Sequence, residues 1–100
     1  MANFTSLTYT FDDTTAAVTR SYTCLKDSTV IVVVLGTQYQ ASGSVKLNDT
    51  VLFSYDKNVY APKYMEYVDV KAGDVITFNL DGSNAGYRMY GSILHEDGAF

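Results

Sequence analysis

The sequence has few of the residues that build most chemical sites: one cysteine, one histidine, one proline and no tryptophan in 100 residues. With Cys24 alone, neither an intrachain disulfide nor a four-thiolate zinc site can form. With His95 alone, the clustered imidazoles of a cupin-type metal centre are missing. We therefore expect a chain that folds in a reducing compartment without disulfides, metals or other cofactors.

Long apolar runs and an excess of positive charge are also missing. The longest apolar run, residues 30–35, is far shorter than the ~20 residues of a membrane-spanning helix. The first residues lack the basic and apolar regions of a secretory signal peptide. Seven basic against eleven acidic residues give a formal net charge of −4, which repels phosphate backbones and anionic lipid heads. We expect no membrane insertion and no nucleic-acid partner.

Valine, threonine and tyrosine dominate instead, and no window has the apolar spacing of a long amphipathic helix. Alternating segments are separated by turn signals about every ten residues, as in β-sandwiches. The expected strands are 4–11, 17–25, 30–35, 38–47, 51–55, 64–70, 75–80 and 87–94. This length suits one domain, so we predict a single all-β domain over residues 1–100, an antiparallel, jelly-roll-like sandwich of about eight strands.

Two alternating strands joined by a glycine turn are predicted by the segment VDVKAGDVITF, residues 68–78. A two-residue loop would bury a carboxylate, whereas an odd-numbered loop keeps the apolar positions on one face. The odd loop pairs Val70 with Ile76 and Val68 with Phe78, and it allows the turn glycine a positive φ. We therefore predict a β-hairpin with that register.

The same register sorts the side chains between two faces, because successive residues of a strand point to opposite sides. The predicted core set is Val68, Val70, Ile76, Phe78 and Leu80. The opposite face carries a mixed set: Met65, Tyr67, Asp69, Val75, Thr77 and Asn79. Residues 30–35 are apolar on both faces, which indicates either a core strand covered on each side or a strand at a subunit interface.

Three groups of residues could carry chemistry, and each has a simpler interpretation. His95, Glu96 and Asp97 are adjacent, but neighbours on an extended chain point apart and no nucleophile motif accompanies them, so we interpret them as a solvated tail. Cys24 lies in a strand pattern and is interpreted as a small buried hydrophobe. The acidic turns lack the spacing of a calcium-binding loop and are interpreted as ordinary turns. Their candidate oxygen ligands are Asp12, Asp13, Asp81, Ser83 and Asn84.

The nine tyrosines are the most prominent functional signal, because such rings stack on sugars or anchor protein interfaces. We expect half or more of them to belong to the core. Tyr60, in the loop with the single proline, and Tyr67, on the outer face beside Met65, are least explained by a core. We predict Tyr60, Met65 and Tyr67 as binding residues for a partner surface or a glycan, and no catalytic residues.

The segment 68–78 with its turn Lys71-Ala72-Gly73-Asp74, preceded by a strand-loop-strand block and followed by a short final strand, resembles jelly-roll modules of bacteriophage virion proteins. Such modules occur in tail fibres, tail tips and head-surface proteins and look like tumour necrosis factor-type trimer knobs. The similarity covers residues 18–94 in pattern.

The resemblance implies a non-enzymatic virion structural or host-recognition subunit, present in the virion after synthesis in the host cytoplasm. It further implies a homotrimer packed through sheet faces, with other virion proteins and a host-surface glycan as partners. The alternative is a carbohydrate-binding, lectin-like β-sandwich module, which would account for the tyrosines. The family shares no catalytic residues that could be transferred to this chain.

Overall fold

The computed structural model describes residues 6–11, 17–36, 42–81 and 89–100. Within these ranges the chain forms eight β-strands and no helix, so the all-β prediction is confirmed. The strands are β1 (Ser6–Phe11), β2 (Ala17–Thr23), β3 (Ser28–Gly36), β4 (Gly43–Leu47), β5 (Thr50–Tyr55), β6 (Lys63–Val70), β7 (Val75–Asp81) and β8 (Met89–His95).

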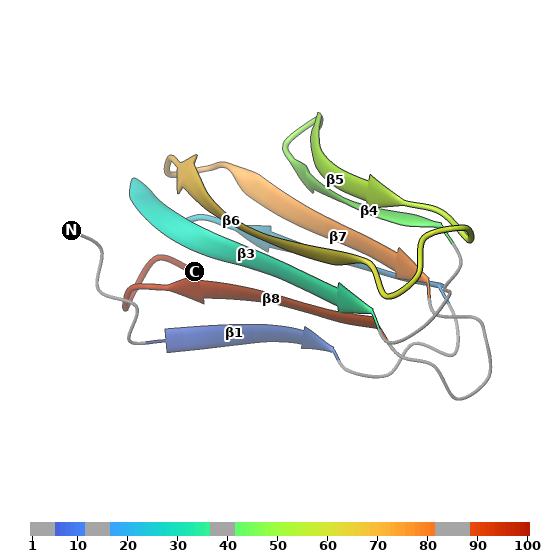
Figure 1. Ribbon diagram of the computed structural model, residues 1–100. Coiled ribbons are helices and arrows are strands. Elements are labelled where there is room, and N and C mark those ends of the chain that lie inside the picture. The colour runs from blue at the N-terminus through green and yellow to red at the C-terminus, as the bar shows by residue number, and fades with distance from the viewer. Residues whose placement is uncertain (1–5, 12–16, 37–41, 82–88) are drawn as a thin grey trace.

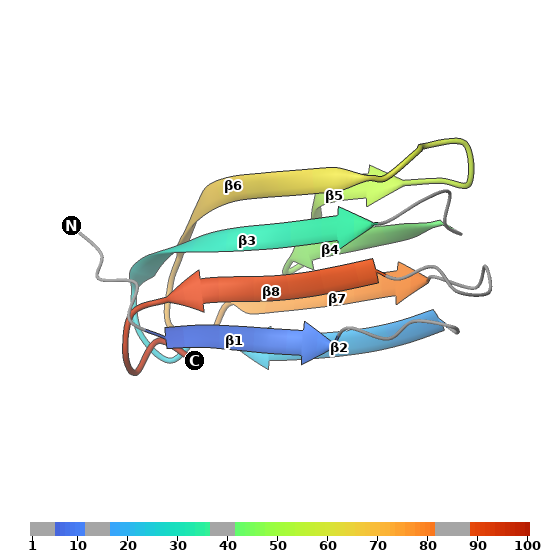
Figure 2. The same cartoon turned by 60° about the horizontal axis from the view of Figure 1, so that its bottom comes forward.

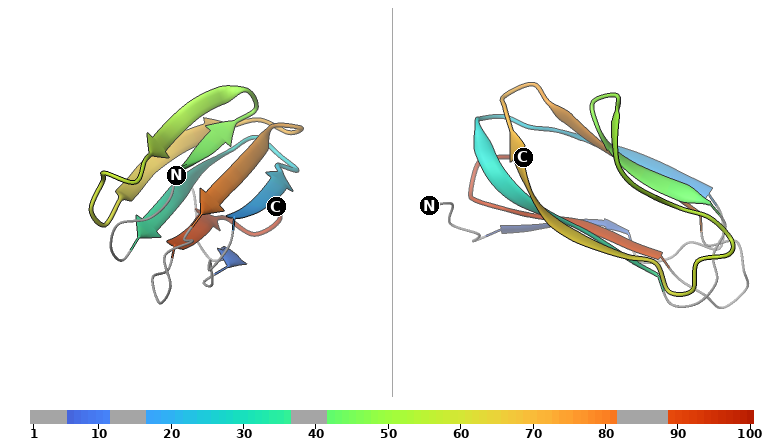
Figure 3. Two further views of the ribbon diagram at one scale, coloured as in Figure 1. Left: turned by 90° about the vertical axis from the view of Figure 1, so that its right-hand side faces the viewer. Right: turned by 45° about the horizontal axis from the view of Figure 1, so that its top comes forward.

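The strands form two antiparallel four-stranded sheets that face each other as the layers of a sandwich (Figures 1 and 3). Sheet A has the order β1-β8-β3-β6 and sheet B the order β2-β7-β4-β5. Figure 2 looks through the layers, with sheet A in front of sheet B. Only β4 and β5 are both consecutive in the chain and paired in a sheet, so every other connection passes between the layers. This strand order is that of a jelly roll.

The core lies between the inner faces of the two sheets, and its residues follow the alternation of each strand. The largest fully buried side chains of the strands are Phe78, Ile76, Leu80, Met89, Ile93, Val30, Val32, Val34 and Val45. Val68 and Val70 are also buried, so all five side chains predicted for the core from the segment around Gly73 are there. Burying a side chain such as Phe78 contributes about 2–3 kcal/mol to folding.

The predicted hairpin between β6 and β7 is wrong, although its two faces are assigned correctly. The strand β6 pairs with β3, where Val70 lies opposite Ser28, and β7 pairs with β2 and β4. The pairs of Val70 with Ile76 and of Val68 with Phe78 therefore do not form. A tight turn and a period-two pattern are common to a hairpin and to an arch between layers, so the local sequence does not distinguish them.

Neighbouring segments hold this arch in place. Gly73 has a φ of 94°, as its predicted role requires. The Asp74 backbone N–H donates to the Lys71 carbonyl at 2.9 Å, and the Asp74 carboxylate accepts from the Lys71 N–H at 2.9 Å. Cys24 forms two backbone hydrogen bonds with the turn. Its N–H donates to the Asp74 carbonyl at 2.7 Å, and its carbonyl accepts from the Gly73 N–H at 2.8 Å. The connection between β2 and β3 therefore fixes the connection between β6 and β7.

Aromatic rings fill the space between the strands at one side of the sandwich. Phe53 of β5 stacks on Tyr64 of β6 with ring centroids 5.1 Å apart, and on Tyr55 at 6.2 Å. Burial, and secondarily the nearby Glu66 carboxylate, raise the pKa of the Tyr64 hydroxyl above its usual 10.0. These rings join β5 and β6, which belong to different sheets.

Candidate functional site

The outer face of sheet A carries a contiguous group of apolar side chains, called here the apolar face. Its members are Ile31, Val33, Leu35, Met65, Tyr67 and Leu94. Met65 and Tyr67 are each 70% exposed, and Leu35 is 43% exposed. An exposed apolar group of this kind is a common mark of an interaction surface.

Strand register assembles the apolar face. Ile31 of β3 lies opposite Tyr67 on one side and Leu94 on the other. Val33 lies opposite Met65, one row along the sheet. Directly opposed residues of an antiparallel pair share a face. One row of these side chains therefore crosses β8, β3 and β6, and the row of Val33 and Met65 crosses β3 and β6.

The doubly apolar strand 30–35 therefore has two different environments. Val30, Val32 and Val34 are fully buried in the core, while Ile31 and Val33 are half-buried on the outer face. The core-strand interpretation is confirmed for the first set. An open hollow beside the second set is lined by Val33, Leu35, Lys63, Tyr64 and Met65.

Charged residues lie at both ends of the outward row of β6. Lys63 opens the strand opposite Leu35, and Asp69 stands near its other end opposite Thr29. The Thr29 hydroxyl donates to the Asp69 carboxylate at 2.7 Å, which holds that side chain on the outer face. Along the strand, the exposed row thus consists of a cation, two large apolar side chains and an anion.

The structure brings two of the three predicted binding residues together. Met65 and Tyr67 lie at alternate positions of β6 on the apolar face, exposed as the sequence predicts. Tyr60 is also exposed, at 59%, but it lies in the loop that precedes β6 and so outside the strand rows that define the apolar face.

Tyr60 is displayed by an anchored loop. The following Ala61 has a φ of 48°, and Pro62 is fully buried. The Pro62 carbonyl accepts from Gly36 at 2.8 Å, and a Cβ on Gly36 would meet the proline ring at 2.9 Å. This close approach requires glycine in the neighbouring strand and holds the loop against the sandwich.

Sequence reasoning offered a subunit interface as one interpretation of residues 30–35, but it missed that this strand shares the site with Met65 and Tyr67. It gave Ile31, Val33 and Leu35 no partner strand on the outer side. The signal was present, because the exposed apolar alternation of Met65 and Tyr67 requires a neighbouring strand. Only the pairing of β3 with β6 shows which strand that is.

The prediction that His95 belongs to a solvated tail is wrong. His95 ends β8 and is only 4% exposed, and Phe100 folds back against it with ring centroids 5.2 Å apart. The Nδ1 atom of His95 lies 2.8 Å from the Glu96 carbonyl, which can only accept, so this nitrogen donates. The Leu25 N–H donates to the Ala99 carbonyl at 2.7 Å and secures the returning chain.

The interpretation of Cys24 as a buried hydrophobe is confirmed, since it is 1% exposed. Its thiol donates to the Lys26 carbonyl at 2.9 Å. The cysteine therefore packs in the core beside the turn at Gly73, to which its backbone bonds, and this is a structural role.

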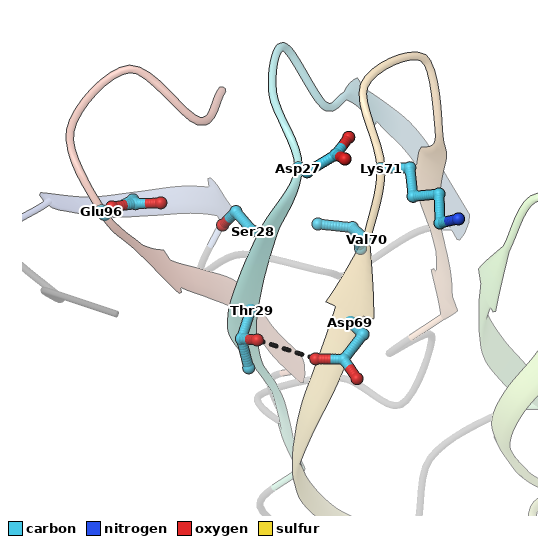
Figure 4. A pocket seen from close by; sticks show the side chains of 7 residues that line it. All are labelled: Asp27, Ser28, Thr29, Asp69, Val70, Lys71 and Glu96. Carbon is cyan, nitrogen blue, oxygen red and sulfur yellow. Dashed lines mark hydrogen bonds between the residues drawn. The ribbon is translucent and has the colours of Figure 1, made fainter. Parts of the chain in front are cut away.

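A second hollow lies at one end of the sandwich and is rich in carboxylates (Figure 4). Its lining residues are Asp27, Ser28, Thr29, Asp69, Val70, Lys71 and Glu96. Asp27 accepts from the Ala72 N–H at 3.0 Å, and Asp69 accepts from Thr29, so these carboxylates serve the turns and strands around them.

Among the described residues, no three metal-ligating side chains come together. The candidate calcium ligands Asp12, Asp13, Ser83 and Asn84 lie outside the described residues.

The fold and the apolar face define a class: a small jelly-roll-like β-sandwich with one apolar outer sheet face. No protein-family model and no curated protein matches the chain. In the described ranges, no helix has the length and apolar character needed to cross a membrane.

Proposed function

We propose that this chain is a non-enzymatic structural subunit of a bacteriophage virion that assembles with its own copies through the apolar face. The observation that carries this proposal is the exposure of Met65, Tyr67 and Leu35 beside one another on a single sheet. Removing apolar surface from water contributes about 25 cal/mol per Å², so covering this face is favourable. Every other copy of the chain carries the same face and can therefore cover it.

The virion part of the proposal rests on the resemblance of residues 18–94 to phage jelly-roll modules. The jelly-roll strand order supports it, because viral capsid domains commonly have this architecture. Other virion proteins are the expected further partners. The resemblance also implies a homotrimer, in which cyclic closure would cover sheet faces without open growth. Host recognition is the role expected of surfaces left uncovered by assembly.

The positions of the polar residues also support a non-enzymatic role. His95 is buried against Phe100, and the carboxylates of Asp27 and Asp69 bond to a turn and a strand. These groups hold the ends of the sandwich together.

Light scattering over a wide dilution series tests the proposal. We expect a mass above the 11.0 kDa of one chain at micromolar concentration. Replacing both Met65 and Tyr67 by serine should return the mass to that of one chain without lowering the melting temperature. The matched control is Ser21→Ala with Thr77→Ala on the outer face of sheet B. A parent that stays at the single-chain mass at every concentration would contradict the proposal.

A glycan-binding role is the second candidate, and the exposure of Tyr60 at 59% and Tyr67 at 70% favours it. Such rings can stack on sugar faces. The test is a glycan array with the parent, Tyr60→Ala and Tyr67→Ala, with melting temperatures measured in parallel. Saccharide binding lost in either variant at unchanged stability supports this role, and absence of binding by the parent excludes it for the glycans tested.

A further inference from the structure

The outward row of β6 has a charge pattern that is complementary to its own reverse. In chain order its outward residues are Lys63, Met65, Tyr67 and Asp69, all of them exposed. The row therefore runs from a cation through two apolar side chains to an anion. Read backward, it runs from an anion to a cation, so two antiparallel rows place opposite charges together at both ends.

We infer that two copies dock apolar face to apolar face about a twofold axis, with their β6 rows antiparallel. Lys63 of each copy then lies against Asp69 of the other, and Met65 lies against Tyr67. Such an interface is isologous, because each residue pair occurs twice. The inference rests on the proposed use of the apolar face for self-assembly. It specifies the orientation of the second copy, and it replaces the threefold arrangement that the resemblance implies by a twofold one.

Charge excludes the parallel arrangement of the same two rows. Parallel rows would place Lys63 against Lys63 and Asp69 against Asp69, and like charges at an interface disfavour a docking mode. Antiparallel rows replace both repulsions by attractions about 20 Å apart, given ~3.3 Å per residue over the six steps between these positions. In the centre, the thioether of Met65 meets the ring of Tyr67, a favourable sulfur–aromatic contact.

The contact uses the faces of the sheets and not their edges. Because side chains alternate along β6, Glu66 points away from the outward row and takes no part in face-to-face docking. Edge-to-edge pairing of two β6 strands in the same antiparallel register would instead set Glu66 opposite Glu66. Directly opposed like charges destabilise a strand pair.

Lys63 is available for such a contact. Within the part of the chain that the structure describes, it has no carboxylate partner, in contrast to Lys26, whose ammonium lies 4.0 Å from Glu96. Asp69 is exposed, and one of its carboxylate oxygens accepts from Thr29, which orients the group.

Mixing two charge-reversal variants tests this orientation. Lys63→Glu places an anion against Asp69 at both ends of the interface, and Asp69→Lys places a cation against Lys63. Each variant alone should self-associate at least about tenfold more weakly than the parent. An equimolar mixture of the two variants restores opposite charges at both ends, so it should regain the parental mass, twice the single-chain 11.0 kDa.

Two controls separate the contact from effects on folding. Lys46→Glu makes the same charge change on the outer face of sheet B and should leave the mass unchanged. For Lys63→Glu alone, salt of about 1 M, where the Debye length is ~3 Å, should screen the repulsion and restore association.

The possible outcomes distinguish this inference from the proposed function. Association restored by mixing supports the twofold contact. A mixture that remains as weak as its components overturns the contact, as does a parental mass three times that of one chain. In those two cases a self-associating parent still supports the structural-subunit proposal. A parent that never associates overturns both.

Discussion

The two sheets cover the same core, yet their outer faces differ in chemistry. The outer face of sheet B is mainly polar, with Val51 as an exposed apolar exception. On it, Thr19 lies 3.4 Å from Asn79 and Ser21 lies 3.1 Å from Thr77, oxygen to oxygen. The outer face of sheet A carries the apolar face, which lies mostly on β3 and β6. One face packed and one face solvated is the usual pattern of an antiparallel sheet, and sheet B follows it. Sheet A departs from it at the apolar face.

A substitution in the core beneath both faces should have the largest effect on stability. Phe78 is fully buried between the sheets, and Phe78→Ala should lower the free energy of unfolding by about 3–5 kcal/mol. Thermal denaturation followed by circular dichroism measures this loss. The control, Thr19→Ala on the exposed polar face, should change stability by no more than about 0.5 kcal/mol. Equal losses for the two variants would show that the sandwich core is misassigned.

The next effect should distinguish the two faces directly. Tyr67→Ala on the apolar face should weaken self-association by about 2 kcal/mol, or ~30-fold, with little change in melting temperature. Thr77→Ala on the polar face should leave association unchanged. Sedimentation equilibrium measures both. If Tyr67→Ala instead melts early and associates normally per folded molecule, Tyr67 is a stabilising residue and the contact surface lies elsewhere.

A smaller effect is expected at the turns that connect the sheets. The Lys71 N–H, and then the Asn48 amide at 3.1 Å, hold the pKa of Asp74 below its ordinary value of 3.8. A lowered pKa in the folded state means that ionised Asp74 stabilises the fold above that value. This contribution is lost as the pH falls through the folded-state pKa.

The measurement for Asp74 is the difference in melting temperature between the parent and Asp74→Asn at several pH values. The difference should be present at neutral pH and shrink below pH 3.8. A difference that stays constant down to about pH 3 would contradict the role of the charge. Because the turn lies at the end of the sandwich, association through the apolar face should be unaffected.

No effect is expected from the removal of metal ions. Treatment with a chelator should leave the melting temperature and the assembled mass unchanged, because a structural metal would contribute several kcal/mol to folding. Differential scanning fluorimetry with and without chelator checks this. A melting temperature lowered by many degrees would indicate a metal held by the acidic turns. The two outer faces would then not be the main difference to explain.

The fold class and the division of side chains between faces could be predicted from the sequence because both depend on local alternation. Val70 and Phe78 are buried and Met65 and Tyr67 are exposed, as period two requires. The strand partners could not be predicted in this way. A turn such as that at Gly73 reverses the chain equally well within a sheet or between sheets, and long-range contacts decide which occurs.

The C-terminal residues show the same limit. His95 was predicted to be solvated because neighbours on an extended chain point apart and no nucleophile motif accompanies it. Burial of its ring depends on Phe100 returning across the end of β8 and on the bond between Leu25 and Ala99. The two residues of that bond are far apart in the chain, so no local sequence pattern predicts it.

By itself, the sequence determined which side chains share a strand face and where the chain turns, since both follow from backbone geometry over a few residues. The tertiary structure alone decided that β3 lies between β6 and β8, which converts two separate apolar patterns into one apolar face. The physical reason is that pairing between distant strands is selected by the packing of a shared core. The chemistry of the outward residues takes no part in that selection.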